Sequence, residues 1–349
     1  MSDRVQTVPA AEQASTGTNG NEPLEQRLFE DLLQKYRAAL LTSEQLETTP
    51  ITPRAKLLGE WLRECDLGFL YGERGIGKTW LVCAVATHVS TGNNLGTWKS
   101  WGAFPVLYVD GEMAQDSTRD RLKGMFEANK NLHVLHHERL FDLSGLSMNL
   151  ANPLIQKVIT NLCIGKEIKV LILDNLSCLV SGVKENDSDA WEQLLFWLLE
   201  LRRRRIAVII VHHAGRNGFM RGTSKREDPA AWVIKIESSS KANPTEDGAK
   251  FETKFEKIRN TSTPEWIRIW HFKTESTGEV SIACQEIGFD GKVLQLIQDG
   301  LETNSEIANE LNCTAGTVSK AAKRLEAAKL IEIRKRRYYP RGFMNQNET

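Results

Sequence analysis

Residues 72–79, with the sequence GERGIGKT, constrain this chain more than any other feature. An apolar run at 67–71 precedes them and predicts a buried strand, and residues 80–86 after them predict a helix. A glycine-rich turn between a strand and a helix lets successive backbone N–H groups point at one anion. The final lysine suits the β- and γ-phosphates, and the final threonine suits Mg²⁺. The segment therefore predicts a P-loop for a nucleoside triphosphate, formed by Gly72, Glu73, Arg74, Gly75, Ile76, Gly77, Lys78, Thr79 and Trp80.

Composition limits the class of protein. The 349 residues are 41% hydrophobic, and basic and acidic side chains are balanced at 45 each, so net charge alone indicates no polyanionic partner. No apolar stretch is long enough to span a membrane and the N-terminus lacks a signal peptide's apolar core, which favours a cytoplasmic protein. The cysteines include no C-x-x-C pair, which argues against a zinc ribbon or a disulfide framework and fits a reducing compartment. They are Cys65, Cys83, Cys163, Cys178, Cys284 and Cys313.

The first 54 residues have two distinct patterns. Residues 1–23 are rich in Ser, Thr, Gly, Asn and Gln without periodicity, which predicts a disordered tail. Residues 24–54 are expected to hold an amphipathic helix, up to residue 40, followed by a linker with two prolines. The apolar stripe of this helix needs a partner surface, either on the rest of its own chain or on a neighbouring subunit.

Residues 55–286 alternate between strand-like and helix-like segments, which is typical of a mostly parallel sheet flanked by helices in an α/β fold. Strands are predicted at 106–110, 168–174 and 206–211, and each ends at polar residues, where α/β sheets place their sites. Residues 232–272 are more hairpin-like and predict antiparallel strands at one edge of the sheet.

A small second domain is predicted at residues 288–341, ahead of a tail at 342–349. Three helices and a hairpin are expected in order at residues 293–297, 305–311, 316–330 and 331–339, with Ser305 capping the second helix. This order of elements indicates a winged helix-turn-helix domain.

Two carboxylates are suited to the chemistry of a bound triphosphate. Asp174 ends a predicted strand and is expected to hold Mg²⁺, together with Thr79. Asn175 follows it where AAA+ ATPases have a catalytic glutamate, so the base that activates water must come from elsewhere. Glu112 is the candidate, because a carboxylate at the tip of the strand next to the P-loop is the RecA-class arrangement. A plain loop carboxylate is the alternative.

An ordered set of motifs resembles the RecA-fold ATPases of the plasmid RepA and DnaB replicative-helicase type. The motifs are residues 72–79, 110–112 (DGE), 173–177 (LDNLS), 211–215 (VHHAG), 220–224 (MRGTS) and 255–260 (FEKIRN). The resemblance covers roughly residues 55–285. It implies a RecA-like core that hydrolyses ATP with Mg²⁺ and assembles into a homo-oligomeric ring, a hexamer in the relatives.

The resemblance gives roles to further side chains. One of His212 and His213, taken as His212, would sense the nucleotide and relay its state to a DNA-binding loop, with a structural histidine pair as the alternative. Lys257 and Arg259 alternate along a predicted strand and so share a face. In similar helicases this pair enters the neighbour's active site, where an arginine stabilises transition-state charge only after assembly. The alternative is a solvated pair at an edge strand.

Basic loops are candidates for contacts with single-stranded DNA. In similar helicases two mobile loops line a central channel and grip phosphates, and residues 181–189 and 215–228 are the counterparts here. The second loop contributes Arg216, Arg221, Lys225 and Arg226. Four arginines at 202–205 are instead expected to end a helix, where cations suit the helix dipole.

The C-terminal domain concentrates positive charge. Nine basic and two acidic side chains lie between Lys320 and Arg341, a local charge of +7. The third helix is expected to enter a DNA major groove while the hairpin lies on the backbone. The residues are Thr317, Ser319, Lys320, Lys323, Arg334 and Arg336. A winged helix used for protein contacts is the alternative.

One histidine-rich segment, residues 133–138, holds His133, His136, His137 and Glu138. Its spacing is not that of a zinc protease, so no functional metal is expected there.

Together these features predict an ATP-dependent DNA helicase or translocase of a plasmid, phage or integrated element. Lys78, Glu112 and Asp174 would carry hydrolysis within one chain. Expected partners are other copies of the chain, DNA, and a primase or initiator protein, with no membrane. Two alternatives stay open: a DNA-dependent ATPase that loads or forms a filament without unwinding, and a nucleotide-controlled DNA-binding regulator.

Overall fold

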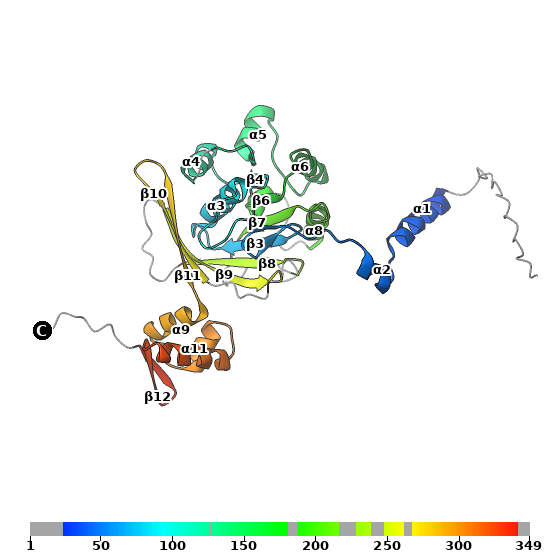
Figure 1. The fold of residues 1–349 in the computed structure, drawn as a ribbon. Coiled ribbons are helices and arrows are strands. Elements are labelled where there is room, and N and C mark those ends of the chain that lie inside the picture. Colours follow the sequence, from blue (N-terminus) through cyan, green and yellow to red (C-terminus); the bar gives the residue numbers. More distant parts are fainter. Residues whose placement is uncertain are drawn as a thin grey trace, which may run out of the picture. The chain divides into compact units, whose positions relative to one another are not determined.

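A computed structural model of the chain describes residues 24–125, 128–180, 188–215, 228–238, 248–261 and 267–340 (Figure 1). By its internal contacts the chain divides into two units, Met1–Pro53 and Arg54–Thr349. The predicted DNA-binding residues Arg216, Arg221, Lys225 and Arg226 lie outside the described residues, as do the tails at 1–23 and 342–349 and most of the loop at 181–189.

The first unit contains the expected amphipathic helix, α1 (Leu24–Ala39), and none of its residues is buried. A second helix, α2 (Ser43–Thr48), lies where the sequence predicts only a linker. Its start is fixed by a capping box, in which the Thr42 hydroxyl accepts from the Gln45 N–H and the Gln45 side chain accepts from the Thr42 N–H. Threonine and proline content therefore concealed a local helix signal.

In the second unit, nine described strands form one sheet in the order β11-β10-β9-β8-β3-β7-β6-β4-β5. Neighbouring strands from β8 to β5 are parallel, and those from β8 to β11 are antiparallel. The strands are β3 (Leu67–Gly72), β4 (Val106–Asp110), β5 (Leu132–His136), β6 (Val170–Asp174), β7 (Ala207–His213), β8 (Trp232–Ser238), β9 (Gly248–Ile258), β10 (Ile267–Thr274) and β11 (Val280–Ile287). A short hairpin that the sequence did not predict, β1 (Lys56–Leu58) and β2 (Leu62–Arg63), precedes them.

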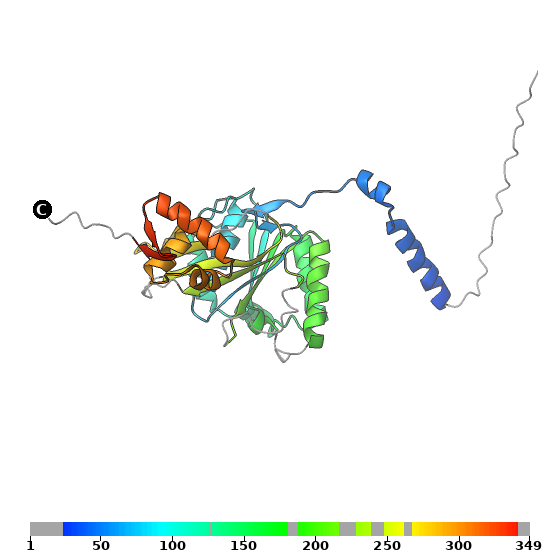
Figure 2. The same ribbon diagram turned by 90° about the horizontal axis from the view of Figure 1, so that it is seen from below.

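Helices cover both faces of this sheet. On one face α3 buries Leu81 and Val85, and on the other α6 and α8 bury Ile159 and Trp197 (Figure 2 shows α8 in green). The helices of this part are α3 (Lys78–Thr91), α4 (Gln115–Met125), α5 (His137–Ser144), α6 (Pro153–Gly165), α7 (Leu176–Leu179) and α8 (Ser188–Arg203). Because both faces are covered, the parallel strands are continuous apolar runs, which made β3, β4, β6 and β7 easy to predict.

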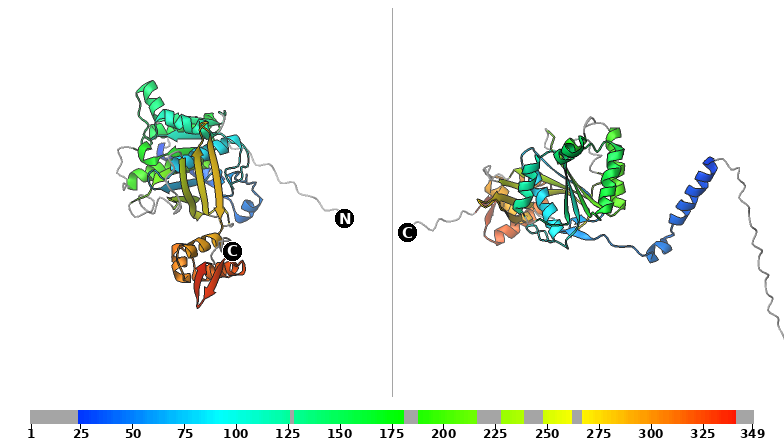
Figure 3. Two further views of the ribbon diagram at one scale, coloured as in Figure 1. Left: turned by 90° about the vertical axis from the view of Figure 1, so that its left-hand side faces the viewer. Right: turned by 90° about the horizontal axis from the view of Figure 1, so that it is seen from above.

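The antiparallel strands β8 to β11 confirm the expectation for residues 232–272 (Figure 3, left). The expectation that the strand before Glu112 lies next to the P-loop strand is wrong. That strand is β4, and both β7 and β6 lie between it and β3. Crossover connections set the order of parallel strands, and nothing in the local sequence pattern specifies them.

The C-terminal module, residues 289–340, has the three helices and hairpin in the expected order. They are α9 (Phe289–Gln298), α10 (Asn304–Glu310), α11 (Ala315–Ala327), β12 (Ile331–Arg334) and β13 (Arg337–Pro340). Their shared core includes Val293, Ile307, Val318 and Tyr338. Ser305 does not cap α10. The cap is Thr303, because only there do the hydroxyl and the N–H pair reciprocally with Glu306.

Within the part of the chain that the structure describes, no helix combines the length and apolar character needed to cross a membrane.

Candidate nucleotide site

The P-loop joins the end of β3 to the start of α3, as the sequence predicts. Gly77 is the N-cap of α3 and has φ +112°, a region that side chains with a Cβ rarely adopt. A Cβ at Gly77 would also lie 2.5 Å from Cδ1 of Phe251 on β9. The loop backbone therefore rests directly on β9, and only glycine permits this approach.

Lys78 places a cation at this loop. Its side chain is largely buried, and Nζ donates to the carbonyl oxygens of Gly72 at 3.0 Å and Glu73 at 2.5 Å. Burial lowers the pKa of the ammonium, and the negative charges of Asp174 and Glu112 oppose that shift. An ammonium held this way is suited to the phosphates of a nucleotide.

Asp174 and Thr79 form a suitable site for a magnesium ion. The carboxylate of Asp174 is 2% exposed, and its Oδ2 accepts from the Tyr108 hydroxyl at 2.7 Å. Burial raises the pKa of Asp174 to about 6, although hydrogen bonds from Tyr108 and Thr79 lower it. Oδ1 has no hydrogen-bond partner among the described residues. A buried carboxylate oxygen beside a threonine hydroxyl fits a hard cation, and Mg²⁺ there would neutralise phosphate charge.

Glu112 reaches the same site although β4 is remote from β3 in the sheet. Its backbone N–H donates to Oδ1 of Asp110 at 3.0 Å, which fixes the turn after β4. The side-chain amide of Asn175 then donates to Glu112 Oε2 and lies 3.2 Å from Nε2 of His213. At the position where AAA+ enzymes have a glutamate, this chain therefore has the amide of Asn175. That amide holds the carboxylate of Glu112, which follows β4.

His213, rather than His212, lines the cavity at the P-loop. The two are adjacent on β7, so their side chains point to opposite faces of the sheet. His212 is 1% exposed and is not among the lining residues. His213 therefore belongs to the site and His212 to the interior. The alternation of side chains along a strand could have predicted that only one of the two faces the site.

The cavity has a volume of about 540 Å³. It is lined by Arg74, Gly75, Gly77, Lys78, Thr79, Trp80, Glu112, Met113, Arg121, Ser177, Cys178, His213, Gly248 and Ala249. Arg121 on α4 was not predicted from the sequence. Its guanidinium carbon lies 4.8 Å from the centre of the Trp80 ring. Trp80 therefore holds a further cation at the cavity, which Arg74 and Lys78 also line.

Lys257 and Arg259 lie away from the chain's own P-loop. Ile258 pairs with Trp232, which pairs with Gly68 near the start of β3, whereas the P-loop begins at Gly72. Along β3, four residues separate Gly68, which is level with Ile258, from Gly72, a distance of about 13 Å. Lys257 Nζ donates to the Asp228 carbonyl at 3.2 Å, and Arg259 is exposed. These two side chains are not among those that line the cavity of their own chain.

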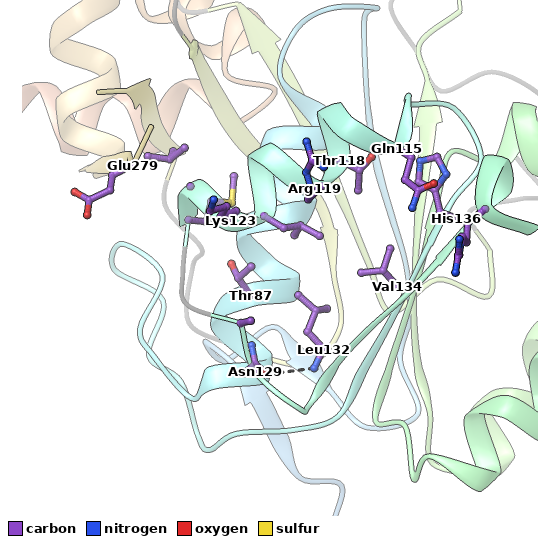
Figure 4. A pocket seen from close by; sticks show the side chains of 16 residues that line it. Thr87, Gln115, Thr118, Arg119, Lys123, Asn129, Leu132, Val134, His136 and Glu279 are labelled. Carbon is purple, nitrogen blue, oxygen red and sulfur yellow. Dashed lines mark hydrogen bonds between the residues drawn. The ribbon is translucent and has the colours of Figure 1, made fainter. Parts of the chain in front are cut away.

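The histidine-rich segment lies in β5 and the start of α5. Among the described residues no group of three or more His, Cys, Asp or Glu is arranged to hold a metal. His136 instead lines a second cavity of about 980 Å³ beside α4 and β5 (Figure 4). None of the predicted catalytic residues lines this cavity.

The predicted DNA-binding residues of the C-terminal module are mostly accessible. Thr317, Lys320 and Lys323 are exposed on α11, and Ser319 is half-buried. Arg334 is exposed but pairs with Glu332 at 2.7 Å. Arg336 lies at the tip of the hairpin, where it and Lys335 have φ values of 64° and 49°.

One protein family matches the part of the chain that contains the P-loop, Glu112, Asp174 and His213. The family AAA_25, described as an AAA domain, matches residues 34–218, just over half of the chain. Similar solved structures include a KaiC-like protein of Pyrococcus horikoshii (15% identity, 63% of this chain and 90% of that one, TM-score 0.46) and the flagellar accessory protein FlaH of Methanocaldococcus jannaschii (14%, 63% and 89%, 0.43). No curated protein sequence matches significantly. With its P-loop, its sheet order and this family match, the chain belongs to the AAA_25 family and is a P-loop ATPase with a RecA-like core.

Proposed function

We propose that this ATPase is a DNA helicase or translocase that acts as a homo-oligomeric ring in the replication of a plasmid, phage or integrated element. The observation that carries the proposal is the distance of Lys257 and Arg259 from the P-loop of their own chain. If these cations complete an active site, that site belongs to a neighbouring copy. Hydrolysis then depends on assembly, as a ring motor requires.

The proposed chemistry follows from the side chains at the cavity. The P-loop N–H groups and Lys78 bind the phosphates of ATP, and Thr79 and Asp174 hold the Mg²⁺. Glu112 acts as general base on the attacking water, and the Asn175 amide orients its carboxylate. Since the same amide lies against His213, this histidine, and not His212, is the better candidate for sensing the γ-phosphate.

DNA binding is assigned to the C-terminal module and to the loop at 215–228. The two-residue turn of the hairpin, Lys335-Arg336, has both residues in the left-handed region, where Asn-Gly is the favoured pair. Each non-glycine residue there costs roughly 1 kcal/mol or more. Two basic residues in this strained turn are therefore best explained by a function, and we assign them contacts with DNA phosphates.

The strained basic hairpin also favours a second candidate, a DNA-binding regulator controlled by nucleotide. A loader or filament-forming ATPase is the third. Both the regulator and the loader or filament-forming ATPase differ from a helicase, because neither separates the strands of duplex DNA.

ATP-dependent unwinding of a forked duplex distinguishes these functions. Wild type, Lys78→Ala and a chain that ends at residue 288 are compared. We expect unwinding by wild type and none by Lys78→Ala. ATP hydrolysis without unwinding, combined with preference for one duplex sequence, would refute the helicase and leave the regulator.

A further inference from the structure

Strand β9 has two functional faces. On one face Phe251 is fully buried beneath Gly77 of the P-loop, and Ala249 lines the nucleotide cavity. The next residue, Glu252, points to the opposite face because side chains alternate along a strand. A single strand therefore supports the P-loop on one side and presents Glu252 on the other.

The C-terminal module docks on that second face. Nζ of Lys292 on α9 lies 3.0 Å from Oε2 of Glu252, and the two side chains are 17% and 10% exposed. Gln295, one turn along α9, is 9% exposed and also lies within 3.5 Å of the Lys292 ammonium. Lys250, two residues from Glu252 on the same face, borders a cleft with Gly291 and Leu294 of α9. The contact is thus a largely buried ion pair with apolar and polar surroundings.

The P-loop itself faces the module across a cleft of about 470 Å³. Glu73 and Ile76 line one side, and Asp299, the C-cap residue of α9, and Glu310 of α10 line the other. The carbonyl of Glu73 is one of the two that accept from Lys78 Nζ. Phosphates would compete with these carbonyls for the ammonium, so a bound nucleotide would change the contacts of the segment that borders the module.

We infer that nucleotide binding and docking of the C-terminal module on β9 are positively coupled. The coupling rests on the nucleotide binding proposed above and extends it to the control of the DNA-binding module. Phe251 packs against the P-loop, which a bound nucleotide would order, and the Lys292–Glu252 pair holds the same strand from its other face. When one partner has ordered the strand, the other loses less entropy on binding. By reciprocity, the docked module must strengthen nucleotide binding by the factor by which nucleotide strengthens docking.

Amide hydrogen exchange on the unmodified full chain tests the inference. Saturation with Mg·ADP is verified in parallel with a ribose-labelled fluorescent ADP. We expect slower exchange in α9 when ADP is bound. Unchanged exchange in α9 at verified saturation overturns the coupling and leaves nucleotide binding intact, whereas failure of ADP to bind overturns both.

Charge reversal gives a second test. Glu252→Lys and Lys292→Glu are each expected to weaken binding of the labelled ADP about fivefold, within the usual range of coupling between sites. The double variant restores the pair with reversed polarity and is expected to recover most of that loss. Lys273→Glu, which breaks the exposed Lys273–Glu275 pair (2.9 Å), is the control and should leave ADP affinity unchanged. Single variants that bind ADP like wild type would overturn the inference.

Discussion

Asp174→Asn is expected to make the protein more stable at neutral pH and inactive. The carboxylate is fully buried with its pKa raised from 3.8 to about 6, so the folded state holds a proton more tightly than the unfolded state does. A shift of about two pH units corresponds to ~3 kcal/mol, which is an upper bound for the gain. Oδ1 has no hydrogen-bond partner among the described residues, so we expect an amide nitrogen at that position to stay unpaired, which subtracts ~1–2 kcal/mol. We therefore expect a gain of about 1–2 kcal/mol at pH 8.

The pH dependence of this gain follows from the direction of the shift. Below about pH 4, Asp174 is protonated in both states and imposes no charge burial. As the pH rises from 4 through 6, the wild type loses stability relative to the variant, because the unfolded state releases the proton first. Above pH 6 the difference is constant. The variant's advantage must therefore appear between pH 4 and 6 and nowhere else.

Urea unfolding of both proteins from pH 4 to 8, without nucleotide or metal, measures this difference. A variant that is less stable than wild type at pH 8, or a difference that does not change with pH, would show that the Asp174 charge is not buried at a cost. Adding Mg²⁺ and ADP should narrow the gap, because only the wild type offers the metal a carboxylate.

Three further outcomes are expected. Glu112→Gln should reduce ATP hydrolysis by at least a hundredfold with little change in ADP affinity, because it removes a general base; equal loss of affinity would contradict that role. Arg259→Ala and Lys78→Ala should each abolish ATPase activity, and mixing the two should restore part of it, since an intact site then forms between them; no restoration would argue against action in trans. Replacing Lys335-Arg336 by Asn-Gly should raise the unfolding midpoint of the C-terminal module and weaken DNA binding. The slope of log affinity against log salt concentration should fall by the equivalent of up to about two phosphate contacts. Unchanged DNA affinity would show that the hairpin is not part of the DNA interface.

Local signals explain what the sequence predicted. The P-loop, β6 with Asp174, and the helices of the C-terminal module each depend on residues within one short window, so their patterns specify them. The capping boxes at Thr42 and Thr303 were equally local. The first was missed because its prolines and threonines indicated a linker, and the second because Ser305 was predicted as the cap.

Contacts between distant segments could not be predicted in the same way. Glu112 and Asn175 meet across 63 residues of sequence, and only the order of β4 and β6 in the sheet brings them together. Arg121 reaches the cavity because α4 packs beside α3, and Trp80 fixes its guanidinium. The division of His212 and His213 between core and cavity likewise depends on which face of β7 meets the P-loop.

Because Arg121 of the same chain also lines the cavity, the result for Arg259→Ala must be interpreted together with that for Arg121→Ala. The Arg121 guanidinium lies over the Trp80 ring and donates a hydrogen bond to the Met113 sulfur at 3.1 Å. If Arg121 supplied the transition-state charge, one chain would hydrolyse ATP alone, and Lys257 and Arg259 would be ordinary surface cations. Arg121→Ala and Arg259→Ala therefore separate a self-sufficient ATPase from an assembly-dependent one. Loss of hydrolysis in Arg259→Ala with activity kept in Arg121→Ala would require a second subunit at every working site, and the reverse result would remove the main argument for a ring.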